Sequence, residues 1–163
     1  MEYSDPATIQ RGTYLISVSP PSPPASSSSA PQSFTVAAVA PYIFTWGANH
    51  GAILNVDYIL NTPDNPAVAG SAIQVYLTGQ GAVNPPVPTR QAAPSTPLSY
   101  TVADTTATID GASANVSFSG LAPGFVGLGQ VNVGIPDGLS PGQHTLVIAI
   151  GGVNTNAVLF NTQ

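Results

Sequence analysis

The two histidines are the side chains in this sequence best suited to acid–base chemistry or to metal binding. His50 follows Gly47-Ala48-Asn49, a run that predicts a turn. His144 is predicted to lie on the side of its strand opposite the apolar face, in contact with solvent. Neither belongs to an HExxH or GxSxG motif, and no phosphate-binding glycine loop is present. We therefore expect no catalytic residue and no enzymatic activity.

Carboxylates are the other candidate ligands for a metal ion. Five of them lie in predicted turns, where Asp usually bonds to its own backbone: Asp57, Asp64, Asp104, Asp110 and Asp137. A calcium site would need several oxygens to converge at about 2.3–2.6 Å, which would require two of these loops to meet. Gly79-Gln80-Gly81 and Gly151-Gly152 do not begin a helix, so dinucleotide binding is not expected. The sequence predicts no metal and no cofactor.

Three aromatic rings recur at every second position in one predicted strand: Tyr42, Phe44 and Trp46. Rings with this spacing beside Ile and Pro usually belong to the core, and that interpretation is favoured. An exposed row of rings would instead be suited to stacking on sugars. For that alternative the candidate ligand-binding residues are Trp46, at the end of the run and best placed for exposure, with Tyr42 and Tyr58.

The elements that would position these side chains are short β-strands separated by turns. Apolar and polar residues alternate in short runs bounded by Gly, Pro, Asn and Asp. The predicted strands cover residues 13–18, 34–39, 41–46, 51–55, 57–60 and 71–78, followed by a meander from residue 100 onward. Two proline-rich segments, residues 19–33 and 79–97, are predicted to be long loops.

The meander carries the strongest pattern in the sequence. Asp110-Gly111 is suited to a two-residue hairpin turn, because both central positions of that turn need positive φ. Val116 and Phe118 are predicted to share one face, and the same alternation recurs at residues 131, 133 and 135 and at residues 146, 148 and 150. Because three strands with one apolar face need a second sheet to cover them, the sequence predicts an all-β antiparallel sandwich.

Charge is scarce, and this limits the choice of partner. Charged residues make up 6% of the chain, against about 25% in a typical soluble protein. There is no Lys, and the net charge is -5, so neither nucleic acid nor an anionic lipid surface is an expected partner. No apolar run reaches the roughly 18 residues of a membrane-spanning helix, so no membrane insertion is expected. The N-terminal residues lack signal-peptide character, so an export signal would have been removed or would lie upstream.

Residues 1–39 are predicted to form an N-terminal arm, or the tail of a preceding β module, before a domain at residues 40–163. The run 12–18 followed by 34–36 is similar to the run 142–148 followed by 158–160, either as a repeated hairpin or by chance. Edge strands are commonly protected by Lys, which this chain lacks. We therefore expect the arm to add a strand to another copy or to an adjacent β module, through Tyr14, Ile16, Val18, Phe34 and Val36.

Several longer segments carry a family resemblance. They are the runs 61–67, 70–71, 75–83, 118–128, 130–132, 135–136 and 151–153, which include Asn61-Thr62-Pro63-Asp64-Asn65-Pro66-Ala67 and Gly120-Leu121-Ala122-Pro123-Gly124. Over about residues 40–162 the chain resembles the C-terminal domain family that is abundant in exported proteins of Solibacter and other Acidobacteria. The resemblance implies an immunoglobulin-like β-sandwich with no characterised enzymatic activity. Gly129 stands where that family usually has an aromatic residue, which would leave either a hollow or a space filled by another side chain.

Together these observations predict a non-catalytic structural or adhesive module of an extracellular or cell-surface protein. The more specific form of this prediction is self-assembly of the module into a filament through strand addition. The alternatives are a carbohydrate-binding module and an accessory domain of a larger exported enzyme.

Overall fold

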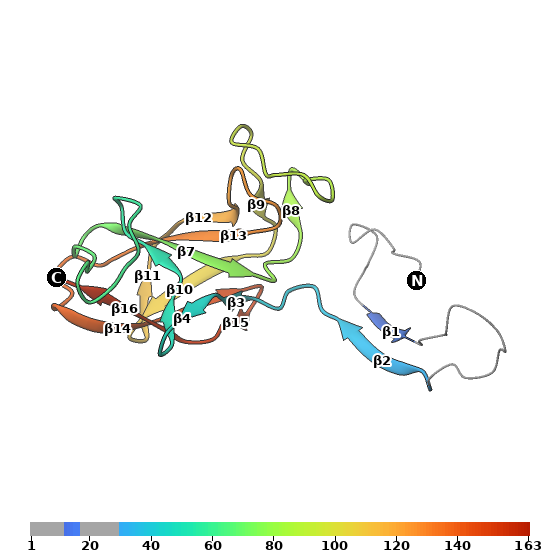
Figure 1. Cartoon of the computed structure of the whole chain (residues 1–163), viewed down its shortest axis with the longest axis horizontal. Helices are drawn as coiled ribbons and strands as arrows, with labels where there is room; N and C mark the ends of the chain where they lie inside the picture. The colour runs from blue at the N-terminus through green and yellow to red at the C-terminus, as the bar shows by residue number, and fades with distance from the viewer. Residues whose placement is uncertain (1–11, 17–29) are drawn as a thin grey trace. The chain divides into compact units, whose positions relative to one another are not determined.

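The computed structural model describes residues 12–16 and 30–163. The chain divides into two compact units, residues 1–38 and 39–163. Every regular element within the described ranges is a β-strand (Figure 1). This confirms the all-β class predicted from the alternation of apolar and polar residues.

The described part of the first unit contains one antiparallel hairpin. Strand β1 (Gly12–Ile16) pairs with β2 (Gln32–Val36), and Tyr14 lies opposite Phe34. The second predicted strand is displaced, because Gln32 and Ser33 already pair with Ile16 and Leu15 while the ladder stops at Val36. Val18 and most of the predicted loop at 19–33 lie outside the described residues.

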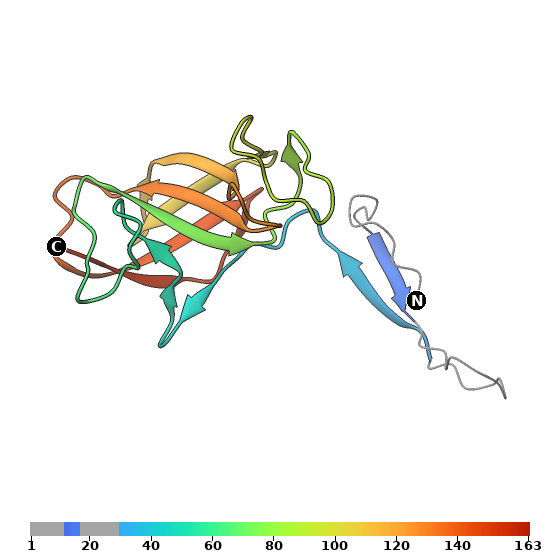
Figure 2. The same cartoon turned by 45° about the horizontal axis from the view of Figure 1, so that its top comes forward.

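The second unit consists of two packed sheets (Figure 2). The β7 sheet has the order β3-β7-β13-β12-β9-β8, with β6 also pairing with β7. Its strands are β3 (Tyr42–Ile43), β6 (Ile53–Leu54), β7 (Ala72–Thr78), β8 (Val83–Asn84), β9 (Tyr100–Thr101), β12 (Val116–Leu121) and β13 (Gly129–Gly134).

The β14 sheet has the order β11-β10-β14-β16-β5-β4, with β15 also pairing with β14. Its strands are β4 (Thr45–Trp46), β5 (His50–Gly51), β10 (Thr105–Ile109), β11 (Ala112–Ala114), β14 (Gly142–Ile150), β15 (Val153–Asn154) and β16 (Val158–Thr162). One pair departs from the predicted antiparallel arrangement: β5 runs parallel to β16, with His50 opposite Leu159.

The core lies between the sheets and is built from alternate residues of the long strands. The β7 sheet supplies Ile43, Ile53, Ile73, Val75, Leu77, Val131 and Val133, and the β14 sheet supplies Ala107, Ile109, Leu146, Ile148, Ile150, Val158 and Phe160. Burying each larger side chain of this set contributes about 1.5–3 kcal/mol. The predicted inward positions 131, 133, 146, 148 and 150 are confirmed.

The segment predicted as one strand at 41–46 passes from one sheet to the other. Ile43 pairs with Leu77 of the β7 sheet, whereas Thr45 pairs with Gly51 of the β14 sheet. The Asn156 side chain fixes this crossing, because its Oδ1 accepts from the backbone N–H of Ile43 at 2.8 Å and its Nδ2 donates to the Ile43 carbonyl at 3.1 Å. The crossing therefore places Ile43 in the core and turns its neighbours outward.

The meander differs from the prediction in two ways. Strands β12 and β13 belong to the β7 sheet and β14 to the β14 sheet, so the three strands face each other across the core instead of sharing one face. In addition, the register shifts between Val116 and Phe118, which lie opposite Val133 and Asn132. This β-bulge puts Val116 toward the core and Phe118 on the outer face of the sheet. The predicted turn at Asp110-Gly111 is present, with φ of 50° and 82°.

The proline-rich segment 79–97 is anchored to the sandwich at several points. Ala93 is buried, and its backbone bonds to Phe125 and Gly124. Gln80 is also buried, and its Oε1 lies 2.8 Å from where a Cβ on Gly129 would stand. The space beside Gly129 is therefore filled by Gln80 and by Leu77, and no hollow is left open there.

The predicted strand at 57–60 is a turn that is held by buried amides. Asn61 Nδ2 donates to Asn55 Oδ1 at 2.8 Å and to the Asn161 carbonyl at 2.9 Å, and Asn61 Oδ1 accepts from the Asn161 backbone N–H. Asp57 Oδ1 accepts from the Ile59 N–H at 3.0 Å, as expected of a turn aspartate. The turn is thereby tied to strand β16.

Candidate functional sites

The predicted ligand-binding rings lie on three different elements. Tyr42 is in β3 and 54% exposed, Tyr58 is in the turn after β6 and 72% exposed, and Trp46 in β4 is half-buried. Trp46 stacks on His50 with ring centroids 5.0 Å apart, and its Nε1 donates to the Gly51 carbonyl. Within residues 12–16 and 30–163, no ring contact joins Tyr42, Trp46 and Tyr58 to one another.

The core interpretation of Tyr42 and Phe44 is wrong. Phe44 is 43% exposed, because the chain crosses between the sheets at this point and directs only Ile43 inward. Trp46, expected to be the most exposed of the three, is the least exposed, because its indole is held by Gly51 and His50. His50, predicted to be a turn residue, belongs to β5.

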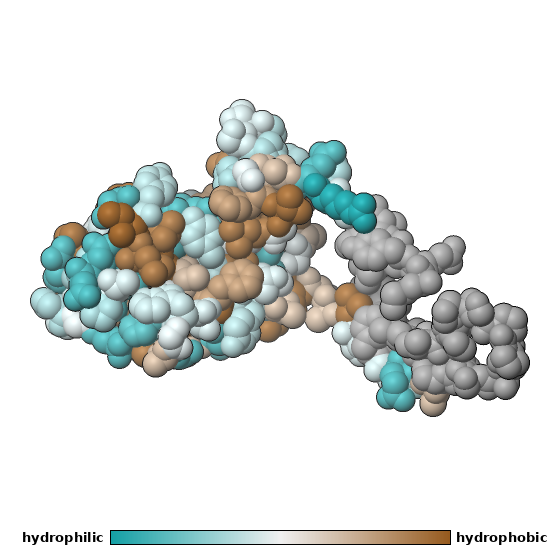
Figure 3. All heavy atoms as spheres, viewed as in Figure 1, coloured by the Kyte–Doolittle hydropathy of each residue, from teal (hydrophilic) through white to brown (hydrophobic). Residues whose placement is uncertain are grey.

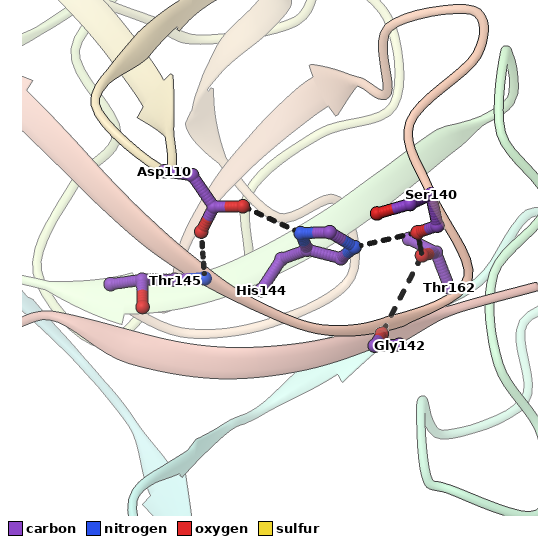
Figure 4. Close-up of polar contacts among 6 residues, drawn as sticks. All are labelled: Asp110, Ser140, Gly142, His144, Thr145 and Thr162. Atoms are coloured by element: carbon purple, nitrogen blue, oxygen red, sulfur yellow. Dashed lines mark hydrogen bonds and ion pairs between the residues drawn. The ribbon is translucent and has the colours of Figure 1, made fainter.

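His144 is buried, with 6% of its surface exposed, which contradicts the prediction of a solvated side chain. It has the same parity along β14 as Leu146, Ile148 and Ile150, and it therefore points inward at the end of that strand. Its Nδ1 lies 2.6 Å from Asp110 Oδ2, and its Nε2 lies 2.8 Å from the Ser140 carbonyl oxygen (Figure 4). Asp110 Oδ1 also accepts from the Thr145 backbone N–H at 2.8 Å.

The partners of His144 determine its protonation state. Both ring nitrogens face groups that only accept hydrogen bonds, a carboxylate and a carbonyl, so both bonds form together only when the ring is a doubly protonated imidazolium. Burial lowers the pKa of His144, but the bonds to Asp110 and Ser140 outweigh it and raise the pKa above its usual value. The hydrogen bond from His144 and then that from Thr145 lower the pKa of Asp110.

The His144–Asp110 pair joins three segments of the fold. Thr162 Oγ1 donates to the same Ser140 carbonyl at 2.8 Å, so the group joins the β10–β11 turn, the start of β14 and the end of β16. Both ring nitrogens of His144 already have a partner, Asp110 Oδ2 and the Ser140 carbonyl oxygen. We call Asp110, Ser140, His144 and Thr162 the histidine clasp. The inward position of His144 could have been predicted from the sequence, because His144 lies two residues before Leu146 and therefore on the same side of the strand.

A second cluster lies on the outer face of the β7 sheet. Tyr100 and Phe118 meet edge to face with ring centroids 5.5 Å apart, and Gln130 Nε2 donates to Asn132 Oδ1 at 2.8 Å. These four residues, which we call the ring–amide face, line a shallow hollow of about 270 Å³ together with Leu98, Ser117 and Pro123. The sequence reasoning missed this cluster, because it placed Phe118 on the core side. The outward positions of Gln130 and Asn132 did follow from the alternation with Val131.

Hydroxyl groups line a second hollow that includes the same two rings. Ser119 Oγ donates to Thr101 Oγ1 at 3.0 Å and lies 2.8 Å from Thr105 Oγ1. A second shallow hollow of about 260 Å³ is lined by these residues, by both rings and by Asp104. The two rings thus line both the amide-lined and the hydroxyl-lined hollow.

Over the described parts of the chain, no three His, Cys, Asp or Glu side chains are grouped as metal ligands would be. Within the same residues, no helix is long and apolar enough to cross a membrane. No protein-family model, curated protein or solved structure matches the chain. The resemblance to the Solibacter domain family therefore stays a prediction.

Proposed function

We propose that the protein is a non-catalytic, immunoglobulin-like module with a structural or adhesive role in an extracellular or cell-surface protein. In the sharper form of this proposal, copies join through strand addition by the β1–β2 hairpin and build a filament. The observation that carries it is the hairpin itself: within the described residues, β1 and β2 pair only with each other.

The order of the strands supports the immunoglobulin-like assignment. Such domains place strands A, B, E and D in one sheet and C, F and G in the other. Named in chain order, β3, β7, β13 and β12 would be A, B, E and D, and β10, β14 and β16 would be C, F and G.

An isolated two-stranded sheet is only marginally stable in water. Each of its outer edges presents unpaired N–H and C=O groups that can pair with a strand of another molecule. A third strand from a second copy would satisfy these groups, and the absence of Lys removes the usual barrier to such pairing.

The surface of the sandwich is also suited to contact with other protein surfaces. Hydrophobic residues gather in patches between hydrophilic ones on the face shown in Figure 3. The exposed large apolar side chains include Val56, Ile59, Val68, Val102, Phe125 and Val126. Exposed apolar patches of this kind are typical of interaction surfaces.

Light scattering of the purified full chain over a range of concentrations tests the assembly. We expect oligomers from the native chain and monomers from Ile16→Pro, because Pro cannot donate in a ladder. Ser27→Pro, in the Pro/Ser-rich segment, is the matched control and should assemble normally. A native chain that is monomeric at every concentration would overturn the proposal, as would equal assembly of the Ile16→Pro variant.

A second candidate function is carbohydrate binding, which the exposed rings of Tyr42 and Tyr58 favour. The face of an aromatic ring is electron-rich and attracts the C–H groups of a sugar. Loss of binding to immobilised oligosaccharides on Tyr58→Ala, with Val56→Ala as the exposed apolar control, would support these rings as the site. Unchanged binding would exclude Tyr58 from it.

A further inference from the structure

We propose that the ring–amide face is the binding site for a neutral saccharide chain, with Tyr100 as the stacking ring. This inference rests on the second candidate function, and it assigns the site to residues other than Tyr42, Trp46 and Tyr58. Four observations carry it: an exposed ring, unpaired amide atoms, the absence of charge, and continuity across neighbouring strands.

Tyr100 offers a ring that is both exposed and fixed. It is 50% exposed, and its contact with Phe118 at an interplanar angle of 61° supports it from one side. A ring held in this way loses little conformational entropy when a ligand stacks on it. One face of a pyranose ring carries C–H groups, which suit the electron-rich face of Tyr100.

The amides next to this ring provide a donor and an acceptor side by side. The bond from Gln130 Nε2 to Asn132 Oδ1 occupies one polar atom of each side chain. Among the described residues, Gln130 Oε1 and Asn132 Nδ2 have no side-chain partner and remain available. Vicinal sugar hydroxyls, each able to donate and to accept, match such a pair.

The charges around the face indicate a neutral ligand. The amide-lined hollow contains no Asp, Glu, His, Lys or Arg, so a carboxylate or sulfate on a sugar would lose its hydration without gaining a counter-charge. Asp104 at the hydroxyl-lined hollow would repel an acidic sugar. The net charge of -5 also disfavours an acidic sugar.

The polar surface continues from β13 onto β7. In the ladder Gln130 lies opposite Tyr76 and Asn132 opposite Gln74, and the Tyr76 hydroxyl donates to Gln74 Oε1 at 3.2 Å. Burial, and then the nearby Tyr58 phenol, raise the pKa of Tyr76, which keeps its hydroxyl protonated.

The path from β7 through β13 and β12 to β9 crosses three inter-strand spacings, or about 14 Å. This length suits a short oligosaccharide better than a single sugar.

The test is binding of the purified full chain to immobilised cellohexaose, xylohexaose, mannohexaose and laminarihexaose, with a hyaluronan hexasaccharide as the acidic comparator. We expect at least one neutral chain to bind and the acidic one not to bind. Tyr100→Ala should weaken binding by about tenfold or more, which corresponds to about 1.4 kcal/mol. Asn132→Ala should weaken it by a smaller factor. Phe44→Ala, which removes an exposed ring between β3 and β4, is the matched control and should bind normally.

The possible failures are distinguishable. Binding that is lost with Trp46→Ala, Tyr42→Ala or Tyr58→Ala but kept with Tyr100→Ala would retain carbohydrate binding and overturn this site. Absence of binding to every neutral chain would overturn both the site and the second candidate function, while leaving the light-scattering test of assembly unaffected. Preference for the hyaluronan hexasaccharide would overturn the neutral ligand. Binding of a peptide of residues 17–31 at Tyr100, with no glycan bound, would assign the face to a proline-rich segment instead.

Discussion

The outer faces of the two sheets differ far more than their inner faces do. Inside, both sheets present the same kind of aliphatic side chain, such as Leu77 on one side and Leu146 on the other. Outside, β13, β12 and β9 of the β7 sheet carry rings and amides, whereas β10 and β14 of the β14 sheet present small side chains, among them Thr106, Thr108, Val147 and Ala149. The stacked Trp46 and His50 lie on the far strands of the β14 sheet, β4 and β5. The inner faces form the core in both sheets. A specific binding site is therefore expected on the outer face of the β7 sheet, where rings and amides replace small side chains.

The largest expected effect would show that the inner faces are energetically alike. Leu77→Ala and Leu146→Ala each remove a fully buried side chain from one sheet, and each should lower the free energy of unfolding by about 2–5 kcal/mol. Urea unfolding of the two variants measures this. A loss below 1 kcal/mol or so in one of them would mean that this sheet contributes little to the core.

A backbone contact in the β7 sheet should give the next largest effect. A Cβ on Gly120 would stand 2.1 Å from the Ser99 carbonyl oxygen, so Gly120→Ala should cost about 1–3 kcal/mol through overpacking. The matched control is Gly134→Ala, whose Cβ would have its nearest neighbour at an ordinary 3.7 Å. Thermal unfolding of both variants checks the difference, and equal midpoints would contradict it.

The histidine clasp of the β14 sheet should make the free energy of unfolding depend on pH. The ring–amide face should have no such effect. The folded-state pKa of His144 is raised above 6.5, so its contribution is complete below that pH and is lost as the pH rises through the folded-state pKa. The pKa of Asp110 is lowered below 3.8, so its contribution is present above that pH and is lost as the pH falls through the lowered pKa.

The clasp should therefore stabilise the fold most between pH 3.8 and pH 6.5, the ordinary pKa values of Asp110 and His144. We expect about 1 kcal/mol, a figure reduced for the half-exposed Asp110. Urea unfolding at a series of pH values should show His144→Gln flattening the profile at its alkaline end. If the free energy of unfolding of the variant followed pH in parallel with that of the native chain, the clasp would not be the source of the pH dependence.

The smallest expected effect concerns the rings of the outer face. Tyr100→Ala should change the free energy of unfolding by no more than about 0.5 kcal/mol, because the side chain is half exposed. Chemical denaturation checks this. A loss above about 2 kcal/mol, as for a core residue, would make Tyr100 a structural residue and remove the contrast between the two outer faces.

Much of the architecture could be predicted from the sequence, because strand periodicity is a local property. The alternation at Val131 and Leu146 identified inward-facing residues, and Asp110-Gly111 identified a turn. The sheet to which each strand belongs depends on pairing between distant segments, so the division of β12, β13 and β14 was not predictable from spacing. The bulge after Val116 breaks the alternation without leaving a Gly or Pro signal, which hid Phe118 and with it the ring–amide face.

The candidate sites were less predictable than the fold. Tyr42 and Phe44 carry the same pattern as core rings, and only the crossing fixed by Asn156 turns them outward. His144 was predictable in principle from its parity with Leu146. Its partnership with Asp110 required the register of β10 against β14, in which Ile109 lies opposite Leu146.

Strand β16 has an unusual place, because it is the last strand described and yet lies between β14 and β5 in its sheet. It brings Val158 and Phe160, both fully buried, so the aliphatic interior stays open until this segment leaves the ribosome. Synthesis of the preceding residues would leave the facing edges of β14 and β5 exposed to other nascent chains. Translation must run through residue 162 before the sandwich can close, because β16 fills the place between β14 and β5.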